Sequence, residues 1–317
     1  FFTDTGVVKS VDGVSFEVPI GKTVGVVGES GCGKSVTSLS LMQLLQRPQG
    51  QIVEGAIRLN LGDGKAYDIA KTPTEKMQGL RGNYVSMIFQ EPMTSLNPVL
   101  KVGRQVRETL LVHHPPMIKA EAKQRGVERF QRVGIPEAEK RYDCYPQELS
   151  GGLRQRGMIA MAMVCKPKLL IADEPTTALD VTIEAQILRL MKELRDETGM
   201  SVLIITHNMG VVAEICDYVY VMYAGKIMEQ AETFELFDHT MHPYTKGLLD
   251  SIPRIGQNAE RLHTIPGVVP NLLHLSQGCP FSNRCEYATD QCRTEKAQLH
   301  PVAPDHQVRC FRCEEEH

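Results

Sequence analysis

One segment constrains this chain more than any other: a glycine-rich loop between a buried strand and a helix. Residues 28–35 read Gly-Glu-Ser-Gly-Cys-Gly-Lys-Ser, which fits the phosphate-loop pattern G-x-x-x-x-G-K-[ST]. The short apolar run that ends at Val27 suits a buried strand, and residues 34–46 have a helical pattern. Glycines let backbone N–H groups turn toward a phosphate, and the helix start adds its positive dipole end. The segment therefore predicts a nucleoside triphosphate site.

Two residues of this loop have chemical roles that the pattern itself predicts. Lys34 would hold the β- and γ-phosphates, and Ser35 would ligate Mg²⁺. Cys32 occupies a variable position of the pattern, and we assign it no chemistry. The other residues that we expect to contact the nucleotide are Gly28, Ser30, Gly31, Gly33 and Val36.

A second strand ends in two acids. Residues 169–172 are too apolar to be exposed, and Asp173 and Glu174 follow them directly. Ligands of parallel sheets gather at the carboxyl ends of strands. We therefore expect Asp173 to reach Mg²⁺ and Glu174 to act as a general base on the attacking water, which is worth roughly 10²–10⁴ in rate.

The organisation of the chain is that of an α/β protein with one inserted segment and a distinct tail. The pattern predicts a strand over 168–172, a helix over 181–198 and a strand over 201–206, and this alternation predicts a parallel sheet flanked by helices. Residues 7–20 predict antiparallel strands with a turn at Asp12-Gly13. A charged, helix-patterned stretch over about 92–160 predicts an inserted helical subdomain. Beyond Ile252 periodicity is lost, so we expect one domain over 1–251 and a cysteine-rich extension over 252–317.

The bulk composition excludes some classes of protein. The net charge of the 317 residues is −3, which provides no global basic field for nucleic acid. No stretch approaches the ~20 apolar residues of a membrane-spanning helix, so a transport role would need separate membrane subunits. The chain shows no signal peptide, and because it starts at Phe1 we expect the natural N-terminus to lie upstream.

A second anion-binding element lies just before the acidic strand. Residues 149–156 read Leu-Ser-Gly-Gly-Leu-Arg-Gln-Arg, so Ser150, Gly151 and Gly152 stand at a predicted helix start. Two phosphate-binding elements far apart in one chain make sense if two chains enclose ATP head to tail. Together with the two motifs above, this segment closely resembles the signature of the ABC ATPases. The resemblance implies a P-loop NTPase fold of that type, with an antiparallel β subdomain and a helical subdomain.

Further residues match the family's motifs in order along the chain. Gln90 resembles the glutamine that touches Mg²⁺ and water and signals to the membrane subunits. Residues 178–180, Ala-Leu-Asp180, resemble the D-loop, and His207 resembles the histidine that contacts the γ-phosphate. An aromatic side chain near the N-terminus stacks on adenine in this family, which here implies Phe2 or its neighbour Phe1. The resemblance also implies that Ser150 serves the ATP of a partner subunit.

The amino-acid sequences of several segments resemble the dipeptide, oligopeptide and nickel importer branch, in particular its D-type subunit. These segments are 91–98, 154–162, 176–181, 242–246 (His-Pro-Tyr-Thr-Lys) and 265–267 (Ile-Pro-Gly). One departure is Leu153 at a position where Met is usual, an apolar exchange that should matter little.

Nine cysteines are many for a cytosolic protein, and five of them crowd the tail. A loop-like region with little core material needs a crosslink to be stable. In a reducing cytosol, cysteine thiols form such a crosslink by binding a metal more often than by forming a disulfide. Four thiolates suit zinc or an iron–sulfur cluster, and none of the gaps in the series Cys279, Cys285, Cys292 and Cys310 is as short as the close pairs typical of zinc. Resemblance to the peptide branch implies a [4Fe–4S] cluster on Cys279, Cys285, Cys292 and Cys310, with Cys313 as the rival of Cys310. Zinc or no metal remain the alternatives.

We therefore expect the ATP-hydrolysing motor of a peptide importer at the cytoplasmic face of the inner membrane. The implied partners are a second, homologous ATPase subunit, two permease subunits and an extracytoplasmic peptide-binding protein, with no nucleic acid. A nickel or other small-solute importer is the first alternative. A soluble ABC ATPase acting on DNA or ribosomes is another, which the acidic balance and the single ATPase unit disfavour. A binding module with an inactive site is a third, and Lys34, Asp173, Glu174 and His207 argue against it.

Overall fold

The chain divides into two units, each assembled from segments that are distant in sequence. The structure is a computed structural model that describes residues 1–62, 64–90, 95–177, 179–252 and 264–314. Unit 1 comprises residues 1–18, 23–54 and 205–317, and unit 2 comprises residues 19–22 and 55–204. Unit 1 holds the phosphate loop and the cysteine-rich tail, and unit 2 holds the acidic strand end and the second anion-binding element.

Unit 1 is built on a mixed sheet whose strand order is β11-β12-β10-β9-β3. Strands β9 and β3 are parallel, and the pairs β9–β10, β10–β12 and β12–β11 are antiparallel. The elements of this unit are β1 (Phe2–Thr3), β2 (Gly6–Val7), β3 (Thr23–Val27), α1 (Lys34–Leu41), α9 (Met209–Ile215), β9 (Tyr218–Tyr223), β10 (Lys226–Glu232), α10 (Thr233–Asp238), α11 (Pro243–Asp250), α12 (Asp290–Thr294), β11 (His300–Ala303), β12 (His306–Val308) and α13 (Phe311–Glu314).

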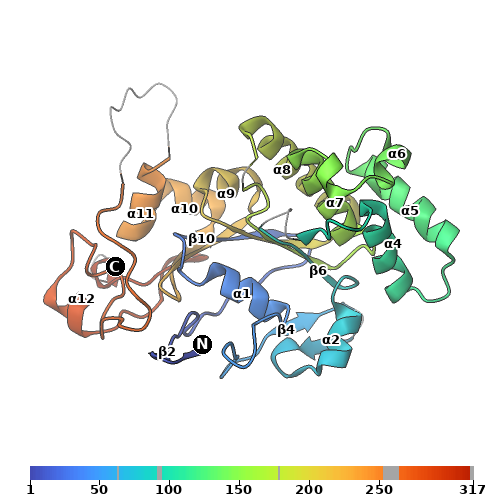
Figure 1. The fold of residues 1–317 in the computed structure, drawn as a ribbon. Helices are drawn as coiled ribbons and strands as arrows, with labels where there is room; N and C mark the ends of the chain where they lie inside the picture. Colours follow the sequence, from blue (N-terminus) through green and yellow to red (C-terminus); the bar gives the residue numbers. More distant parts are fainter. Residues whose placement is uncertain (63, 91–94, 178, 253–263, 315–317) are drawn as a thin grey trace. The chain divides into compact units, whose positions relative to one another are not determined.

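Unit 2 combines parallel strands with a group of helices (Figure 1). Strands β6 and β7 pair in parallel, and β8 follows β7 in the sheet order. The elements of this unit are β4 (Arg58–Asn60), β5 (Ala66–Asp68), the 3₁₀ turn η1 (Ile69–Lys71), α2 (Thr74–Leu80), β6 (Val85–Ile88), α4 (Val102–His113), α5 (Lys119–Arg132), α6 (Ala138–Tyr142), the 3₁₀ turn η2 (Pro146–Glu148), α7 (Gly151–Met163), β7 (Leu169–Asp173), α8 (Val181–Thr198) and most of β8 (Ser201–Thr206).

The bounds of α8 show how local sequence sets an element of this unit. The side chain of Asp180 accepts a hydrogen bond from the Ile183 amide at 2.9 Å and so caps the first turn. Gly199 ends the helix in the left-handed conformation with φ 67°, which glycine adopts without a steric penalty. The helix and the following strand β8 have the bounds that the sequence pattern predicts.

The N-terminal segment differs from its prediction. Apart from β1 and β2, residues 1–22, all described by the structure, contain no strand where antiparallel strands were expected over 7–20. The side chains of Val14, Phe16 and Val18 alternate with exposed neighbours, so the pattern correctly indicates an extended, half-buried segment. Its amides bond to single groups instead of a strand, as in Asp12 N to Gly225 O at 2.9 Å and Glu17 N to the Tyr220 hydroxyl at 3.2 Å.

Candidate functional site

The phosphate loop lies between β3, which is fully buried, and α1. The Lys34 side chain is buried, and its Nζ donates to the carbonyl oxygens of Gly28 at 2.6 Å and Glu29 at 2.9 Å. Gly33 has φ 106°, and a Cβ at this position would collide with the Ser10 carbonyl oxygen, so only glycine fits. Ser30, Gly31 and Ser35 are exposed, and Val36 is half-buried. The loop therefore presents its backbone and the start of α1 to solvent, which is the arrangement that binds phosphate.

Two other predicted residues belong to the same unit. His207 is exposed and follows β8, next to Asn208, whose side chain caps α9 through the Gly210 amide at 2.8 Å. Phe2 lies on β1 with 46% of its surface exposed. Phe1 is half-buried and lies against Gly50. Both aromatic side chains stay candidates for stacking on adenine.

In unit 2 the structure brings Gln90 and Glu174 together at the end of β7. Gln90 Nε2 donates to Glu174 Oε2 at 2.9 Å, and Thr177 Oγ1 donates to the same oxygen at 3.0 Å. The Asp173 and Glu174 residues are buried, with 4% and 9% of their surface exposed. Glu174 has φ 46°, a conformation that costs a non-glycine residue energy and that tends to occur at functional sites. Two donors thus hold the same oxygen of the Glu174 carboxylate.

Sequence reasoning missed two side chains that shape this acidic turn. Thr177 is the second donor to Glu174. Gln155 on α7 is 2% exposed, and its Nε2 donates to the Pro175 carbonyl, so a buried amide holds the chain just beyond Glu174. The signal that could have revealed Gln155 is a polar residue at a buried position of a helix, since such groups are hydrogen-bonded to a specific partner.

The second anion-binding element begins α7. The Ser150 side chain accepts from the Leu153 amide at 3.4 Å, and Ser150 and Gly151 are exposed while Gly152 is half-buried. Asp180 at the start of α8 is exposed as well. The exposure leaves both helix starts accessible to another molecule. Ala178 and residues 91–94, which carry part of the resemblance to the peptide branch, lie outside the described residues.

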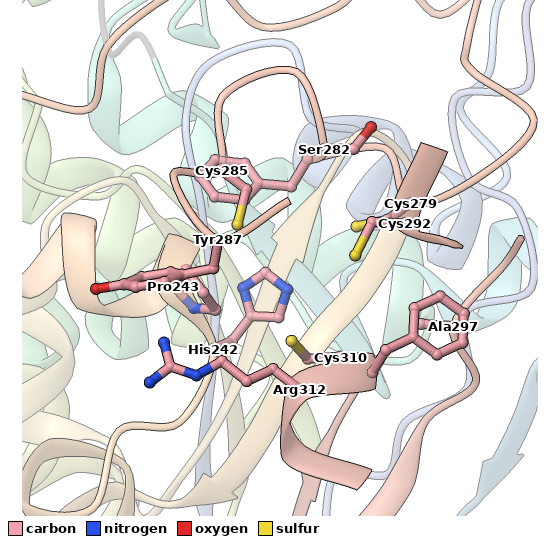
Figure 2. A pocket seen from close by; sticks show the side chains of 12 residues that line it. His242, Pro243, Cys279, Ser282, Cys285, Tyr287, Cys292, Ala297, Cys310 and Arg312 are labelled. Atoms are coloured by element: carbon pink, nitrogen blue, oxygen red, sulfur yellow. The ribbon is translucent and has the colours of Figure 1, made fainter. Parts of the chain in front are cut away.

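The tail gathers its four predicted ligand cysteines around one cavity. Cys279, Cys285, Cys292 and Cys310 all line it, together with His242, Phe281 and Tyr287 (Figure 2). Cys313 is buried, does not line the cavity, and directs its thiol toward the Met241 carbonyl at 3.9 Å. This placement favours Cys310 over Cys313 as the fourth member of the set.

Burial shifts the pKa of two thiols and of the imidazole in this cavity, whereas a side-chain hydrogen bond with Cys313 lowers the pKa of Cys310 to about 6. Burial raises the pKa of Cys279 to about 11 and also raises the pKa of Cys285. Burial lowers the pKa of His242 to about 4, and the ring is neutral. Within the ranges that the structure describes, no group of three or more His, Cys, Asp or Glu side chains has the spacing of a metal site. The structure therefore does not show the predicted metal-binding extension, which stays a prediction.

The loop at α1, the acidic end of β7 and the capped start of α7 together are the motifs of an ATP-binding cassette. Residues 11–177 match the family described as ABC transporter, and residues 228–292 match the family described as oligopeptide/dipeptide transporter, C-terminal region. The chain therefore belongs to the ABC transporter family and is an ABC ATPase. None of the helices in the described part of the chain combines the length and apolar character that a bilayer crossing requires.

Among curated proteins, the chain is 50% identical to the oligopeptide transport ATP-binding protein AppD of Bacillus subtilis, over 100% of this chain and 94% of that protein. It is 50% identical to the oligopeptide transport ATP-binding protein OppD of Haemophilus influenzae, over 92% and 88% of the two chains. Among solved structures, it resembles a dimeric post-hydrolysis state of the ATP-binding cassette MJ0796 bound to ADP and phosphate, with a TM-score of 0.61 and 24% identity over 71% of this chain and 90% of that one. This last likeness shows the fold alone.

Proposed function

We propose that this chain is the ATP-hydrolysing subunit of an ABC importer for di- or oligopeptides. The observation that carries hydrolysis is the orientation of Glu174, which Gln90 and Thr177 fix at the end of a buried strand. The peptide assignment is supported by the match of residues 228–292 and by relatives that are named for oligopeptide transport and match almost the whole chain. A nickel importer of the same branch is the second candidate.

Each part of the cassette has a role in this proposal. Lys34 and the backbone of the loop from Gly28 to Val36 hold the phosphates of ATP, and Ser35 and Asp173 offer the hard oxygen ligands that Mg²⁺ prefers. Bound Mg²⁺ neutralises charge on the phosphates. Glu174 accepts a proton from the attacking water, Gln90 orients that carboxylate, and His207 contacts the γ-phosphate. Phe2 is the proposed stacking partner of adenine.

The exposed helix starts support a proposal for the partners. Ser150, Gly151, Gly152 and Asp180 would complete the ATP site of a second, homologous ATPase subunit, whose own signature completes the site at Lys34. The proposed assembly adds two permease subunits, fed by an extracytoplasmic peptide-binding protein, and places this chain peripherally at the cytoplasmic face of the membrane. Nucleic acid has no part in it.

The hydrolytic role is tested by Glu174→Gln in the full chain together with its partner ATPase. We expect unchanged ATP affinity and hydrolysis slower by about 10²–10⁴-fold, because the amide cannot accept the proton. Glu193→Gln, the same exchange at an exposed position of α8, is the matched control and should keep the wild-type rate. Hydrolysis by Glu174→Gln at the wild-type rate would contradict the role. In the reconstituted transporter, labelled peptide uptake and labelled nickel uptake separate the two substrate classes.

For the tail we propose a [4Fe–4S] cluster held by Cys279, Cys285, Cys292 and Cys310. The supporting observation is that these four thiols, and no other cysteine, line the same cavity (Figure 2). Their chemistry fits the cluster, since four cysteine thiolates are its usual ligands. Zinc, which four thiolates also bind, is the alternative occupant. The cluster would supply a structural crosslink, and no nearby group suggests electron transfer.

The cluster is tested by purifying the protein without oxygen, recording its visible spectrum and assaying iron, sulfide and zinc. We expect a brown protein with roughly four iron and four sulfide per chain, lost in Cys285→Ser and kept in Cys144→Ser, which lies outside the cavity. A colourless protein with one zinc would make the cluster wrong and keep the crosslink. A metal-free protein would leave only the ATPase proposal.

A further inference from the structure

Arg284, in the cysteine-rich tail, makes a bidentate ion pair with Glu29 of the phosphate loop. The Nη1 and Nη2 atoms lie 2.5 and 3.0 Å from the two Glu29 carboxylate oxygens. The Arg284 side chain is 4% exposed and that of Glu29 29%, so solvent screens the pair little. Paired N–H donors aimed at both oxygens fix orientation as well as distance. This contact joins residues that are 255 positions apart.

The remaining donors of Arg284 bond to the tail and to β9, where Nη1 donates to the Tyr223 hydroxyl at 3.4 Å. Its Nε donates to the Pro266 carbonyl at 2.8 Å, and Nη2 also donates to the Ile265 carbonyl at 3.2 Å. Gly267 has φ 82°, and a Cβ there would lie 3.2 Å from the Arg284 side chain. The Ile-Pro-Gly segment at 265–267 therefore binds the guanidinium through two carbonyl oxygens, and Gly267 leaves space for the Arg284 side chain.

A residue of α11 holds the same loop residue. The Glu29 amide donates to the hydroxyl of Tyr244 at 2.8 Å, and Tyr244 is fully buried. The Glu29 carbonyl accepts from Lys34 Nζ at 2.9 Å. Glu29 is thus fixed at its amide, its carboxylate and its carbonyl, and the last of these contacts reaches the lysine that the cassette uses for phosphate.

We infer that Arg284 is a positioning residue of the nucleotide site: with Tyr244 it holds Glu29 so that the phosphate loop keeps its binding shape. A glycine-rich loop has wide backbone freedom, and fixing it beforehand lowers the entropy lost when ATP binds. By this inference the tail contributes to the binding of ATP. The inference rests on the proposed binding of ATP at Lys34, and it assigns to the tail a role that the peptide-import proposal does not require.

The test is calorimetric titration of the full-length protein with MgATP. We expect Arg284→Gln and Glu29→Gln each to raise the Kd about tenfold, which corresponds to about 1.4 kcal/mol. The double variant Glu29→Gln/Arg284→Gln should be no weaker than either single variant, because both remove one interaction. Arg293→Gln, the same exchange at an exposed arginine of the tail that pairs with Asp290, is the control and should bind as the wild type does.

The binding stoichiometry separates positioning from simple loss of folding. A purely structural role would lower the fraction of protein that binds and leave the Kd of that fraction unchanged, and this result would overturn the inference. The double variant keeps the test valid if a single variant misfolds, since it leaves no buried charge without its partner. A wild-type Kd in the double variant likewise overturns the inference and leaves the proposed function intact. Failure of the wild-type protein to bind MgATP would overturn the proposed function, and the inference with it.

Discussion

At the scale of single residues, Glu229 is a carboxylate with no solvent exposure at all. It accepts hydrogen bonds from the amides of Met241 at 2.8 Å and His242 at 3.1 Å. His306 Nε2 lies 2.9 Å from Glu229, and His306 Nδ1 lies 3.2 Å from Glu235. A buried carboxylate is tolerated only with such partners. The imidazole thus links β10 and the start of α10 to β12 of the tail.

This linkage makes the stability of unit 1 depend on pH. Burial disfavours the charged ring, but the hydrogen bonds to Glu229 and Glu235 outweigh it and raise the pKa of His306. The stabilisation is therefore complete below the unfolded pKa of about 6.5 and is lost as pH rises through the raised folded value. We expect the Tm difference between wild type and His306→Gln to shrink from pH 6 to pH 9. His274→Gln, the same exchange at an exposed position of the tail, is the matched control. A His306 difference that stays constant or grows would refute the linkage.

At the scale of elements, the helical part of unit 2 is organised around one aromatic ring. Tyr142 at the end of α6 is 2% exposed and packs against Phe130 of α5 at a ring distance of 5.4 Å. Its ring also lies directly on Gly103 of α4 and Gly126 of α5. Glycine inside a helix lowers helix stability. At these two positions the missing side chain leaves room for the Tyr142 ring against α4 and α5.

A methyl group at Gly103 should therefore separate these helices. Its Cβ would collide with the Tyr142 ring, so we expect Gly103→Ala to destabilise the protein by about 1–3 kcal/mol through overpacking. Gly79 in α2 has open space around it, with no atom within 4 Å of the point where a Cβ would lie. Gly79→Ala should therefore be neutral or stabilising by up to about 1 kcal/mol. Denaturant midpoints of both variants measure this difference, and equal effects of the two exchanges would contradict the packing argument.

Elements also differ in how far the sequence predicts them. The bounds of α8 follow from Asp180 and Gly199, two local signals at its ends. The strands expected over 7–20 do not form, because alternation of side chains indicates an extended, half-buried segment but carries no information about its partner. Helix α1 ends at Leu41, earlier than the helical pattern to 46 predicts. Boundaries without a capping residue are set by packing, which the pattern does not contain.

At the scale of the molecule, the tail packs into the core of unit 1. Phe281 is 3% exposed and lies 5.3 Å from the rings of both Tyr223 and Tyr244. The same buried cluster contains Val27 of β3 and the inner residues of β9 and β10, and Cys279 and Cys285 pack against it. The cysteine cavity and the phosphate loop therefore pack against the same hydrophobic core. This shared core explains why a contact such as Arg284 to Glu29 can be rigid.

The sequence by itself determines the chemistry of this protein wherever function depends on a short segment. The phosphate loop, the acids at the end of β7 and the serine and glycines at the start of α7 are each defined by residues a few positions apart, so their spacing is visible without a structure. The tertiary structure alone decides what holds these segments. Gln155 at the Pro175 carbonyl, and Arg284 and Tyr244 at Glu29, act across folded distance. No spacing rule connects such pairs, because the packing of a shared core determines which distant side chains meet.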